Sequence, residues 1–286
     1  MSWPYYKIPE VAHFYWDLSP LSHLQYLTFR TFKELNPEWT VKLYVPKIKT
    51  NIPDSWKSNE HAIKYTGKDY LDEAKKYIDK VVEVDFSKIG FRNDVSEVFK
   101  SDYIRWHLLS TEGGLWSDCD VLYVGSMDRL NVEQNMINGS SKYLDMGMIT
   151  PKNDLSVYVI GFLLSRPNNE FFKLLKDNTN SKYNPDQYQC LGCNLIKSQF
   201  AKVTDIASSF SSLNISNIDF NVIYPYDWAI LALFEKTEPS IIKENTIGIH
   251  WFNGTDMAKR FQNDFDSGNI DLNSNLTILN YINKYI

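Results

Sequence analysis

The sequence predicts an α/β protein, and three observations point to this class. Strand-like apolar runs alternate with stretches of helical spacing, in the order strand 11–16, helix 20–35, strand 41–45, helix 69–78 and strand 81–84. This alternation is typical of parallel strands joined by helical crossovers. A chain of 286 residues, 43% hydrophobic and 23% charged, is also long enough for one large core. We therefore expect a single domain over residues 1–286.

The first elements have clear local signals. The first strand, Val11–Trp16, is aromatic and β-branched, and helical spacing begins at Pro20. This helix is predicted to end near Leu35, because Asn36-Pro37 stops it. The second strand, Val41–Val45, shows the alternation of a strand.

A later helix is predicted to begin at a cap on Asn93 or Asp94 and to end near Ser110. Glu97 stands three residues after Asp94, where it would complete a capping box. The rest of the chain is less regular. We expect strands at residues 146–150 and 158–164 and helices near residues 169–176 and 187–200.

The most informative segment is residues 101–126, SDYIRWHLLSTEGGLWSDCDVLYVGS. Its acidic pair, Asp118 and Asp120, stands directly before the apolar run 121–124, at the predicted edge of a buried strand. Two carboxylates placed this way offer hard oxygen ligands to one divalent cation, which favours Mg²⁺ or Mn²⁺. The Gly113-Gly114 turn would allow close backbone approach to a ligand. A cation held there can bridge a diphosphate.

Parts of this segment also have purely structural explanations. Asp102 and Arg105 lie three residues apart on one helix face, as in an ordinary surface ion pair. Gly113 could be a helix C-cap as well as a ligand-side glycine. Elsewhere, Asp264 and Asp266 repeat the acidic spacing within a polar stretch that we expect to be a solvated loop.

A histidine near the C-terminus is a candidate third ligand. In TIGIHWFNGT, residues 246–255, a strand is predicted to end at His250 and to enter a loop that contains Gly254. A lone histidine at a strand end is commonly structural, but a neutral imidazole is also a good metal ligand. The sequence leaves both roles open.

Composition excludes several classes of function. The formal charge of −5, a pI near 5.6 and the absence of a basic run argue against a nucleic-acid surface. We expect no signal peptide and no membrane-spanning segment. Three cysteines cannot all pair, which fits a reducing, cytoplasmic compartment, and the single Cys190-x-x-Cys193 pair is expected to be ordinary buried cysteines. The oligomeric state stays open.

Four motifs resemble those of a known enzyme family in order and approximate spacing: HFYW (13–16), SDYIR (101–105), GGLWSDCD (113–120) and IHW (249–251). The chain resembles the DxD-containing sugar transferases of glycosyltransferase family 32. These include capsular-polysaccharide and mannosyl enzymes and are similar to the glucosylating domain of large clostridial toxins. The likeness covers roughly residues 8–255.

The resemblance implies a GT-A fold, with a Rossmann-like nucleotide-sugar-binding half at about residues 1–125, a mixed central sheet and helical additions. The acceptor-side half would span about residues 126–286 and end in a loop that closes over metal and diphosphate. It implies a retaining hexosyltransferase that needs Mn²⁺ or Mg²⁺. The expected donor is a UDP-hexose, UDP-glucose first, and the acceptor a glycan, a lipid-linked sugar or a protein.

The resemblance also implies a role for individual residues. Trp16 would stack on the nucleobase, Asp102 and Arg105 would hold donor-sugar hydroxyls, and Asp118 and Asp120 would serve ribose and metal, with Asp120 the more direct ligand. His250 would complete the metal shell, and a nearby Lys259 or Arg260 would assist at the leaving group. The expected donor-binding set is Trp16, Asp102, Arg105, Gly113, Gly114, Trp116, Asp118, Asn253 and Gly254.

Three positions depart from the family pattern. Trp116 stands where relatives commonly have tyrosine, so a hydroxyl contact near the donor would be lost. Ile160-Gly161 occupies a region where a polar residue often faces the reacting sugar, and Cys193 follows Gly192 where many relatives have proline. These changes affect the expected acceptor contacts more than the donor site.

Two other kinds of protein could share some of these sequence features with a sugar transferase. Phosphatases of the haloacid dehalogenase type also use Asp-x-Asp with Mg²⁺, but they need a second acidic pair at a later strand end, which this sequence lacks. A catalytically silent nucleotide-sugar-binding or scaffold protein with the same fold remains open. Metal-dependent release of sugar from a nucleotide sugar would separate this alternative from an enzyme.

Overall fold

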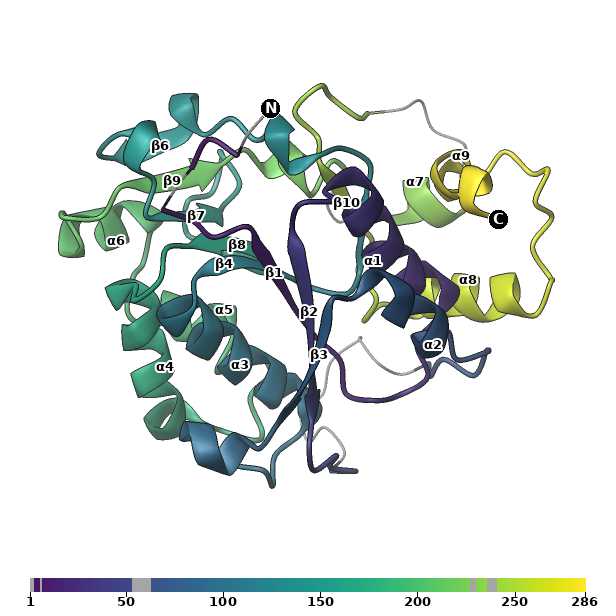
Figure 1. Ribbon diagram of the computed structural model, residues 1–286, viewed down its shortest axis with the longest axis horizontal. Helices are drawn as coiled ribbons and strands as arrows, with labels where there is room; N and C mark the ends of the chain where they lie inside the picture. The colour runs from purple at the N-terminus through teal and green to yellow at the C-terminus, as the bar shows by residue number, and fades with distance from the viewer. Residues whose placement is uncertain (1–2, 6, 53–62, 227–229, 236–240) are drawn as a thin grey trace.

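The computed structural model describes residues 3–5, 7–52, 63–226, 230–235 and 241–286. Its centre is an eight-stranded sheet in the order β3-β2-β1-β4-β8-β7-β9-β6, beside a two-stranded sheet of β5 and β10 (Figure 1). The strands are β1 (Val11–Tyr15), β2 (Thr40–Pro46), β3 (Lys80–Val84), β4 (Gly114–Ser117), β5 (Val121–Tyr123), β6 (Met136–Asn138), β7 (Met146–Ile149), β8 (Val159–Ser165), β9 (Ile215–Ile218) and β10 (Gly248–His250).

Helices cover both faces of the large sheet. Figure 1 shows α1 and α2 on one side and α3 and α4 on the other. The α-helices are α1 (His23–Leu35), α2 (Leu71–Ala74), α3 (Glu97–Thr111), α4 (Glu170–Lys182), α5 (Cys193–Lys197), α6 (Val203–Ser209), α7 (Ile230–Phe234), α8 (Asp256–Asp266) and α9 (Thr277–Ile282). The predicted α/β class with a mixed central sheet is confirmed.

Strands β3, β2, β1 and β4 run parallel and form the Rossmann-like half of the sheet. Successive residues of β1 enter different cores, as the two-residue period of a strand requires. Phe14 packs on Phe29 and Phe32 of α1, whereas Tyr15 joins the cluster that contains Trp106 of α3. Burial on both faces explains why the first strand is mainly apolar, and its one polar side chain, His13, is hydrogen-bonded to Tyr44 and to the Gly113 carbonyl.

The sheet changes direction between β4 and β8, which pair antiparallel. Strands β7 and β8 are antiparallel, β7 and β9 are parallel, and β9 and β6 are antiparallel, so the whole sheet is mixed. In the small sheet, His250 of β10 lies opposite Val121 of β5. This pairing brings the predicted histidine next to Asp120, although the two are far apart in sequence.

The predicted cap of α3 is wrong. The helix begins at Glu97 and its N-cap is Ser96, not Asn93 or Asp94. Long-range partners explain the shift, because the Glu97 carboxylate accepts hydrogen bonds from Thr50 and Tyr15. The Asn93 side chain is occupied elsewhere and accepts from the backbone N–H of Phe86.

Two predictions in the later chain are also wrong. The helix expected over residues 187–200 is reduced to α5, because the carbonyl of Gln189 accepts from Gly192 and Asn194 in a turn where Gln189 has φ 57°. Asp264 and Asp266 lie at the end of α8, not in a loop. The Asp266 carboxylate accepts from Tyr65, so it ties α8 to the segment before α2.

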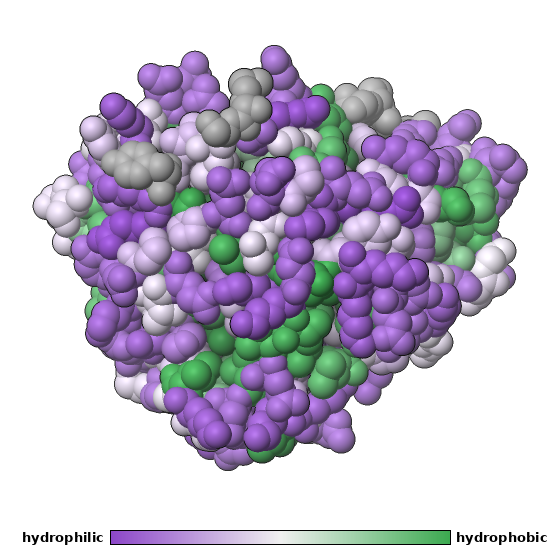
Figure 2. Space-filling model, in the orientation of Figure 1, coloured by the Kyte–Doolittle hydropathy of each residue, from purple (hydrophilic) through white to green (hydrophobic). Residues whose placement is uncertain are grey.

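The face of the molecule shown in Figure 2 is mainly hydrophilic. It has a hydrophobic area in its lower middle part, where the edge strand β3 runs in Figure 1. Val81 of β3 is among the exposed large apolar residues. Within the described parts of the chain, every helix is too short or too polar to pass through a bilayer.

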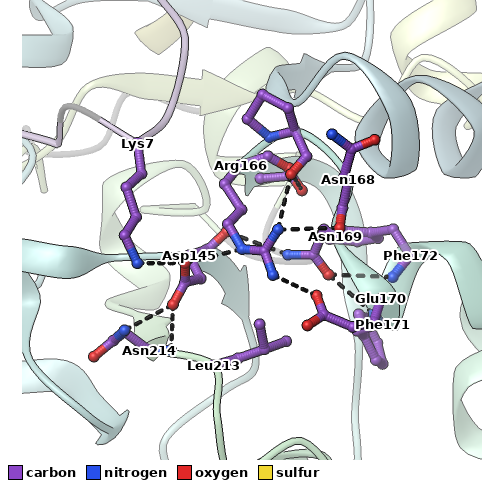
Figure 3. A network of polar contacts seen from close by, with 12 residues as sticks. Lys7, Asp145, Arg166, Asn168, Asn169, Glu170, Phe171, Phe172, Leu213 and Asn214 are labelled. Atoms are coloured by element: carbon purple, nitrogen blue, oxygen red, sulfur yellow. Dashed lines mark hydrogen bonds and ion pairs between the residues drawn. The ribbon is translucent and has the colours of Figure 1, made fainter.

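A buried carboxylate joins the N-terminal segment to the antiparallel half of the sheet (Figure 3). The Asp145 side chain accepts from Lys7 at 2.8 Å, from Arg166 at 3.0 Å, and from the backbone and side-chain N–H groups of Asn214. Burial alone would raise the pKa of Asp145, but Lys7 and Asn214 outweigh it and hold that pKa below its usual range. The carboxylate is therefore charged when the protein is folded at neutral pH.

We expect Asp145→Asn to lower the free energy of unfolding by about 1–3 kcal/mol near neutral pH, because it removes a buried, charged acceptor. A lowered folded-state pKa stabilises above the unfolded pKa of about 4, and this contribution is lost as the pH falls below it. The difference between wild type and variant in denaturant unfolding should therefore shrink between about pH 5 and pH 3. A constant difference, or an equal loss in the exposed control Asp128→Asn, would contradict this role.

Candidate functional site

A cavity of about 460 Å³ opens where the sheet changes from parallel to antiparallel. Such a switch in an α/β sheet leaves a crevice outside the carboxyl ends of the strands. Trp16 follows β1 and Asp118 follows β4, and both line this cavity. The structure thus brings most of the predicted site residues to one place: Trp16, Asp102, Arg105, Trp116, Asp118, Asp120, His250, Asn253 and Gly254.

Asp118, Asp120 and His250 form one cluster. Each offers a ligand atom, and these atoms all lie within 4.8 Å of one another. The Nε2 of His250 is 3.2 Å from Oδ1 of Asp120, while Oδ2 of Asp120 accepts from the backbone N–H of Asn253 at 2.8 Å. Two carboxylates and one imidazole fit Mn²⁺ or Mg²⁺ better than a soft metal that prefers thiolates.

The hydrogen bonds of His250 indicate which of its two ring nitrogens carries the proton. The backbone N–H of Phe252 points at Nδ1 from 3.3 Å, so Nδ1 accepts and Nε2 donates to Asp120. Burial would raise the pKa of Asp120, but His250 and the Asn253 N–H lower it. A metal bound through Nε2 requires the other tautomer, because a ligating nitrogen must present a lone pair. Metal binding would therefore move this proton and give up the long contact from Phe252.

Arg105 ties the helix side of the cavity to the acidic pair. Its guanidinium donates to Asp102 at 2.9 Å and to Asp118 at 3.2 Å, with only 5% of the side chain exposed. It also lies over the ring of Trp116, 4.9 Å from the ring centroid. The Asp102–Arg105 pair is therefore buried inside the site, and the surface ion pair considered from the sequence is excluded.

Asp102 keeps one oxygen for a ligand. Oδ1 accepts from Arg105, whereas the buried Oδ2 has no hydrogen-bond partner in the described structure. Burial raises the pKa of Asp102 to about 6, with nearby Asp118 acting in the same direction and Arg105 against it. A buried acceptor without a partner is costly, so a hydroxyl donor in the cavity would be held here.

Trp116 cannot supply the hydroxyl of the tyrosine that relatives commonly have at this position, but it supplies an indole N–H. Its buried indole N–H donates to Oδ1 of Asp118 at 2.8 Å. Together with Arg105, this bond fixes one Asp118 oxygen and leaves Oδ2 facing the His250 side. The missing tyrosine hydroxyl is thus replaced by an N–H that orients a candidate metal ligand.

Trp16 forms a wall of the cavity beyond β1. Its indole N–H donates to the carbonyl of Ser19 at 2.7 Å, and the Asp17 carboxylate accepts from the Ser19 N–H at 2.9 Å. Leu18 between them has φ 64°, a conformation that costs energy for a residue with a side chain. This tight turn clamps the edge of the indole, so the ring is positioned before any ligand arrives.

The Asn253–Gly254 loop lies between the acidic pair and α8. Lys259 of α8, which is 8% exposed, donates to Oδ1 of Asn253 at 2.5 Å, and Gln262 donates to the same atom. Burial lowers the pKa of Lys259 to about 8, against the opposing effect of Asp120. The ammonium therefore remains mostly charged at neutral pH and holds the loop beside Asp120.

Gly113 and Gly114 are not among the cavity-lining residues, contrary to expectation. They stand at the other end of β4 from Asp118, with φ angles of 70° and 97°. A Cβ on Gly113 would come within 2.6 Å of the Ser165 carbonyl, and one on Gly114 within 2.4 Å of the Val11 carbonyl. Gly113 also follows the C-cap of α3, so helix termination and strand packing explain both glycines.

Sequence patterns missed several lining residues, including Tyr15, Gln25, Tyr158, Tyr188, Gln189 and Tyr224. Tyr224 lies next to a candidate metal ligand, since its ring packs against His250 with centroids 4.9 Å apart. It follows no motif or regular spacing. Gln189 gave no sequence signal either, and only its positive φ marks it out.

The family described as "Capsular polysaccharide synthesis protein" matches residues 67–191, which include Asp102, Arg105, Asp118 and Asp120 but less than half of the chain. This match confirms the resemblance to DxD-containing sugar transferases that the motifs predict. A search among curated proteins found no match.

Several solved structures resemble the fold. The PaToxG glycosyltransferase has 13% identity and a TM-score of 0.44, over 72% of this chain and 71% of that one. The galactosyltransferase LgtC has 14% identity and a TM-score of 0.44, over 90% and 95%. The glycosyltransferase GlyE of Streptococcus pneumoniae TIGR4 has 13% identity and a TM-score of 0.44, over 97% and 64%. These distant likenesses assign no activity to this chain.

Gly161 leaves open the space in front of Asp118, Asp120 and His250, the candidate metal-ligand cluster. A Cβ there would lie 3.0 Å from Oδ2 of Asp118 and 3.0 Å from Nε2 of His250. We expect Gly161→Ala to remove most of the thermal stabilisation that Mn²⁺ gives the wild type, because the methyl group occupies part of the ion's coordination sphere. Overpacking should also cost about 1–3 kcal/mol of stability without metal.

The matched control is Gly192→Ala, whose methyl group would crowd Asp102 at 3.0 Å instead of the cluster. Each variant is compared with its own unfolding midpoint without metal, so a general loss of stability does not affect the result. A full response to Mn²⁺ in Gly161→Ala would place the ion elsewhere.

Proposed function

We propose that this chain is a metal-dependent, retaining hexosyltransferase that uses a UDP-linked donor, UDP-glucose first. One observation carries the proposal: the Asp118–Asp120–His250 cluster, the buried Asp102–Arg105 pair and the aromatic wall at Trp16 line the same cavity. A nucleotide sugar has a base, a diphosphate and a sugar, and this cavity offers a surface suited to each. The family match to capsular polysaccharide synthesis proteins supports the same conclusion.

The sugar end is proposed to lie against Asp102 and Arg105. Oδ2 of Asp102, which has no partner among the described residues, would accept a sugar hydroxyl, and the Arg105 guanidinium holds Asp102 and Asp118 together. A Cβ on Gly192 would lie 3.0 Å from that oxygen, so the glycine leaves the space beside it unfilled. This arrangement orients the anomeric carbon relative to the diphosphate, which is how positioning lowers a barrier.

The leaving diphosphate is proposed to lie beside Asp118, Asp120 and His250. A divalent ion held by these residues would act as a Lewis acid toward the leaving phosphate oxygens. Lys259 keeps the Asn253–Gly254 loop against Asp120 and adds positive charge on that side. The buried surroundings strengthen each of these interactions relative to water.

Retention is proposed to proceed by attack on the face that the diphosphate leaves. Within the described residues, the carboxylates that line the cavity are Asp102, Asp118 and Asp120. Asp102 is paired with Arg105, and the other two belong to the metal-ligand cluster. None of them stands apart as a covalent nucleophile, which favours a route in which the acceptor hydroxyl enters beside the departing oxygen.

The acceptor is proposed to approach from the part of the chain beyond residue 126, where Tyr158, Tyr188 and Gln189 line the cavity. Aromatic faces and an amide suit a sugar, whose rings carry both C–H surfaces and hydroxyls. A glycan or a lipid-linked sugar is therefore favoured over a bare protein side chain.

The central test uses a panel of nucleotide sugars with Mn²⁺ and measures release of free sugar and UDP. Asp118→Asn with Asp120→Asn should abolish metal-dependent hydrolysis, a loss of at least about 100-fold, because both anionic ligands are gone. Asp264→Asn, at the exposed first position of the second Asp-x-Asp, should keep wild-type turnover. Wild-type turnover in the double variant, with circular dichroism unchanged, would refute the proposed function.

Trp16→Ala should weaken UDP binding by about 1–3 kcal/mol, or roughly 5- to 150-fold in Kd, because a stacking surface is lost. Trp16→Phe keeps an aromatic face and should retain most of the affinity. Isothermal titration of UDP into each protein measures the effect. An unchanged Kd in the alanine variant would remove Trp16 from the base site.

A further inference from the structure

The hydroxyl of Tyr224 is a further polar group close to Asp118 and His250. The position of a Cβ on Gly161 would lie 2.8 Å from the Tyr224 hydroxyl, 3.0 Å from Oδ2 of Asp118 and 3.0 Å from Nε2 of His250. The three polar atoms therefore surround one point at the floor of the cavity. Tyr224 is 3% exposed and lines the cavity.

The tyrosine ring is held firmly. It stacks on Phe220 with centroids 5.0 Å apart and packs against His250 at 4.9 Å and Phe252 at 6.1 Å. The preceding residue, Ile223, accepts a hydrogen bond from the backbone N–H of His250 at 2.8 Å. The phenol and the imidazole are thus fixed relative to each other by both backbone and side chain.

The hydroxyl is placed as a donor. A phenol has one proton to give, and the hydroxyl lies beside the backbone of Gly161. The two neighbouring polar atoms, on Asp118 and His250, are the ones that a cation would take. Among the three polar atoms found there in the described structure, the Tyr224 hydroxyl is the one suited to donate to an anionic ligand oxygen.

We propose that Tyr224 donates a hydrogen bond to an oxygen of the leaving diphosphate, and so stabilises the charge that develops as the sugar–oxygen bond breaks. This role rests on the proposed transferase function. The phenol keeps its proton throughout, so it acts as a fixed dipole and not as an acid. Preorganised donors of this kind act most strongly in a buried site, where little reorganisation is needed.

An alternative is that the hydroxyl only orients Asp118 or His250 as metal ligands. The two roles differ in what they predict. A donor to the leaving group changes kcat at saturating metal and donor, whereas a group that orients ligands changes the concentration of Mn²⁺ needed for half-maximal activity. Substitution by phenylalanine keeps the ring that packs on His250 and removes only the hydroxyl.

The test compares wild type, Tyr224→Phe and the control Tyr103→Phe in Mn²⁺-dependent hydrolysis of UDP-glucose. Tyr103 is a buried tyrosine outside the cavity, and its hydroxyl donates to the Ile89 carbonyl. We expect Tyr224→Phe to lower kcat by about 10- to 100-fold with an unchanged Mn²⁺ midpoint, because one hydrogen bond to a charged oxygen is lost. Tyr103→Phe should keep the wild-type kcat.

Three results would overturn the assignment. One is an unchanged kcat in Tyr224→Phe, and another is a shifted Mn²⁺ midpoint with kcat restored at saturating metal. The third is an equal loss in Tyr103→Phe, which would trace the effect to general loss of a buried hydroxyl. If the wild type itself releases no sugar from any nucleotide sugar, the proposed function fails first and the role of Tyr224 falls with it.

Discussion

The site depends on an imbalance of charge in a largely buried space. Asp102, Asp118 and Asp120 line the cavity, and a single buried guanidinium, Arg105, contacts two of them. Buried charges are costly unless they are paired, and three carboxylates against the guanidinium of Arg105 and the ammonium of Lys259 leave a net negative charge. Part of this strain is visible in the pKa of Asp102, raised to about 6 by burial and by the nearby Asp118. A divalent cation would offset the remaining charge, and His250, as a neutral ligand, would add none.

The fold creates this space between β4 and β8, where the parallel half of the sheet meets its first antiparallel strand. The backbone N–H of Asp118 bonds to the carbonyl of Gly161, so the end of β4 and the start of β8 meet directly at the cluster. The pairing of β5 with β10 then brings in the C-terminal segment, so that Asn253 contacts Asp120 across 133 residues of sequence. The candidate ligands thus come from two backbone segments, the turn that carries Asp118 and Asp120 and the end of β10 that carries His250, and the strand pairing holds these segments together.

Local patterns predicted those parts of the molecule that local interactions determine. The strand at Val11–Tyr15, the helix that ends at Leu35 and the position of the acidic pair follow from apolar periodicity and breaker residues. The errors arose where distant partners prevailed, as when Thr50 and Tyr15 engaged Glu97 and moved the start of α3. The resemblance predicted His250 as a metal ligand, but its distance from Asp120 needed the β5–β10 pairing, which no sequence spacing encodes.

A departure from a family motif can be interpreted only with a structure, as three positions show: Trp116, Gly161 and Gly192. At Trp116 the expected hydroxyl is gone, yet an indole N–H holds Asp118 and the ring supports Arg105. At the two glycines the important feature is an absent side chain, since a Cβ at either position would lie 3.0 Å from a carboxylate oxygen of Asp118 or Asp102. A search of the sequence for functional groups does not detect a glycine that matters because it has no side chain. The depth of the cavity at its polar end is therefore a tertiary property, set by which backbone atoms lie opposite the acids.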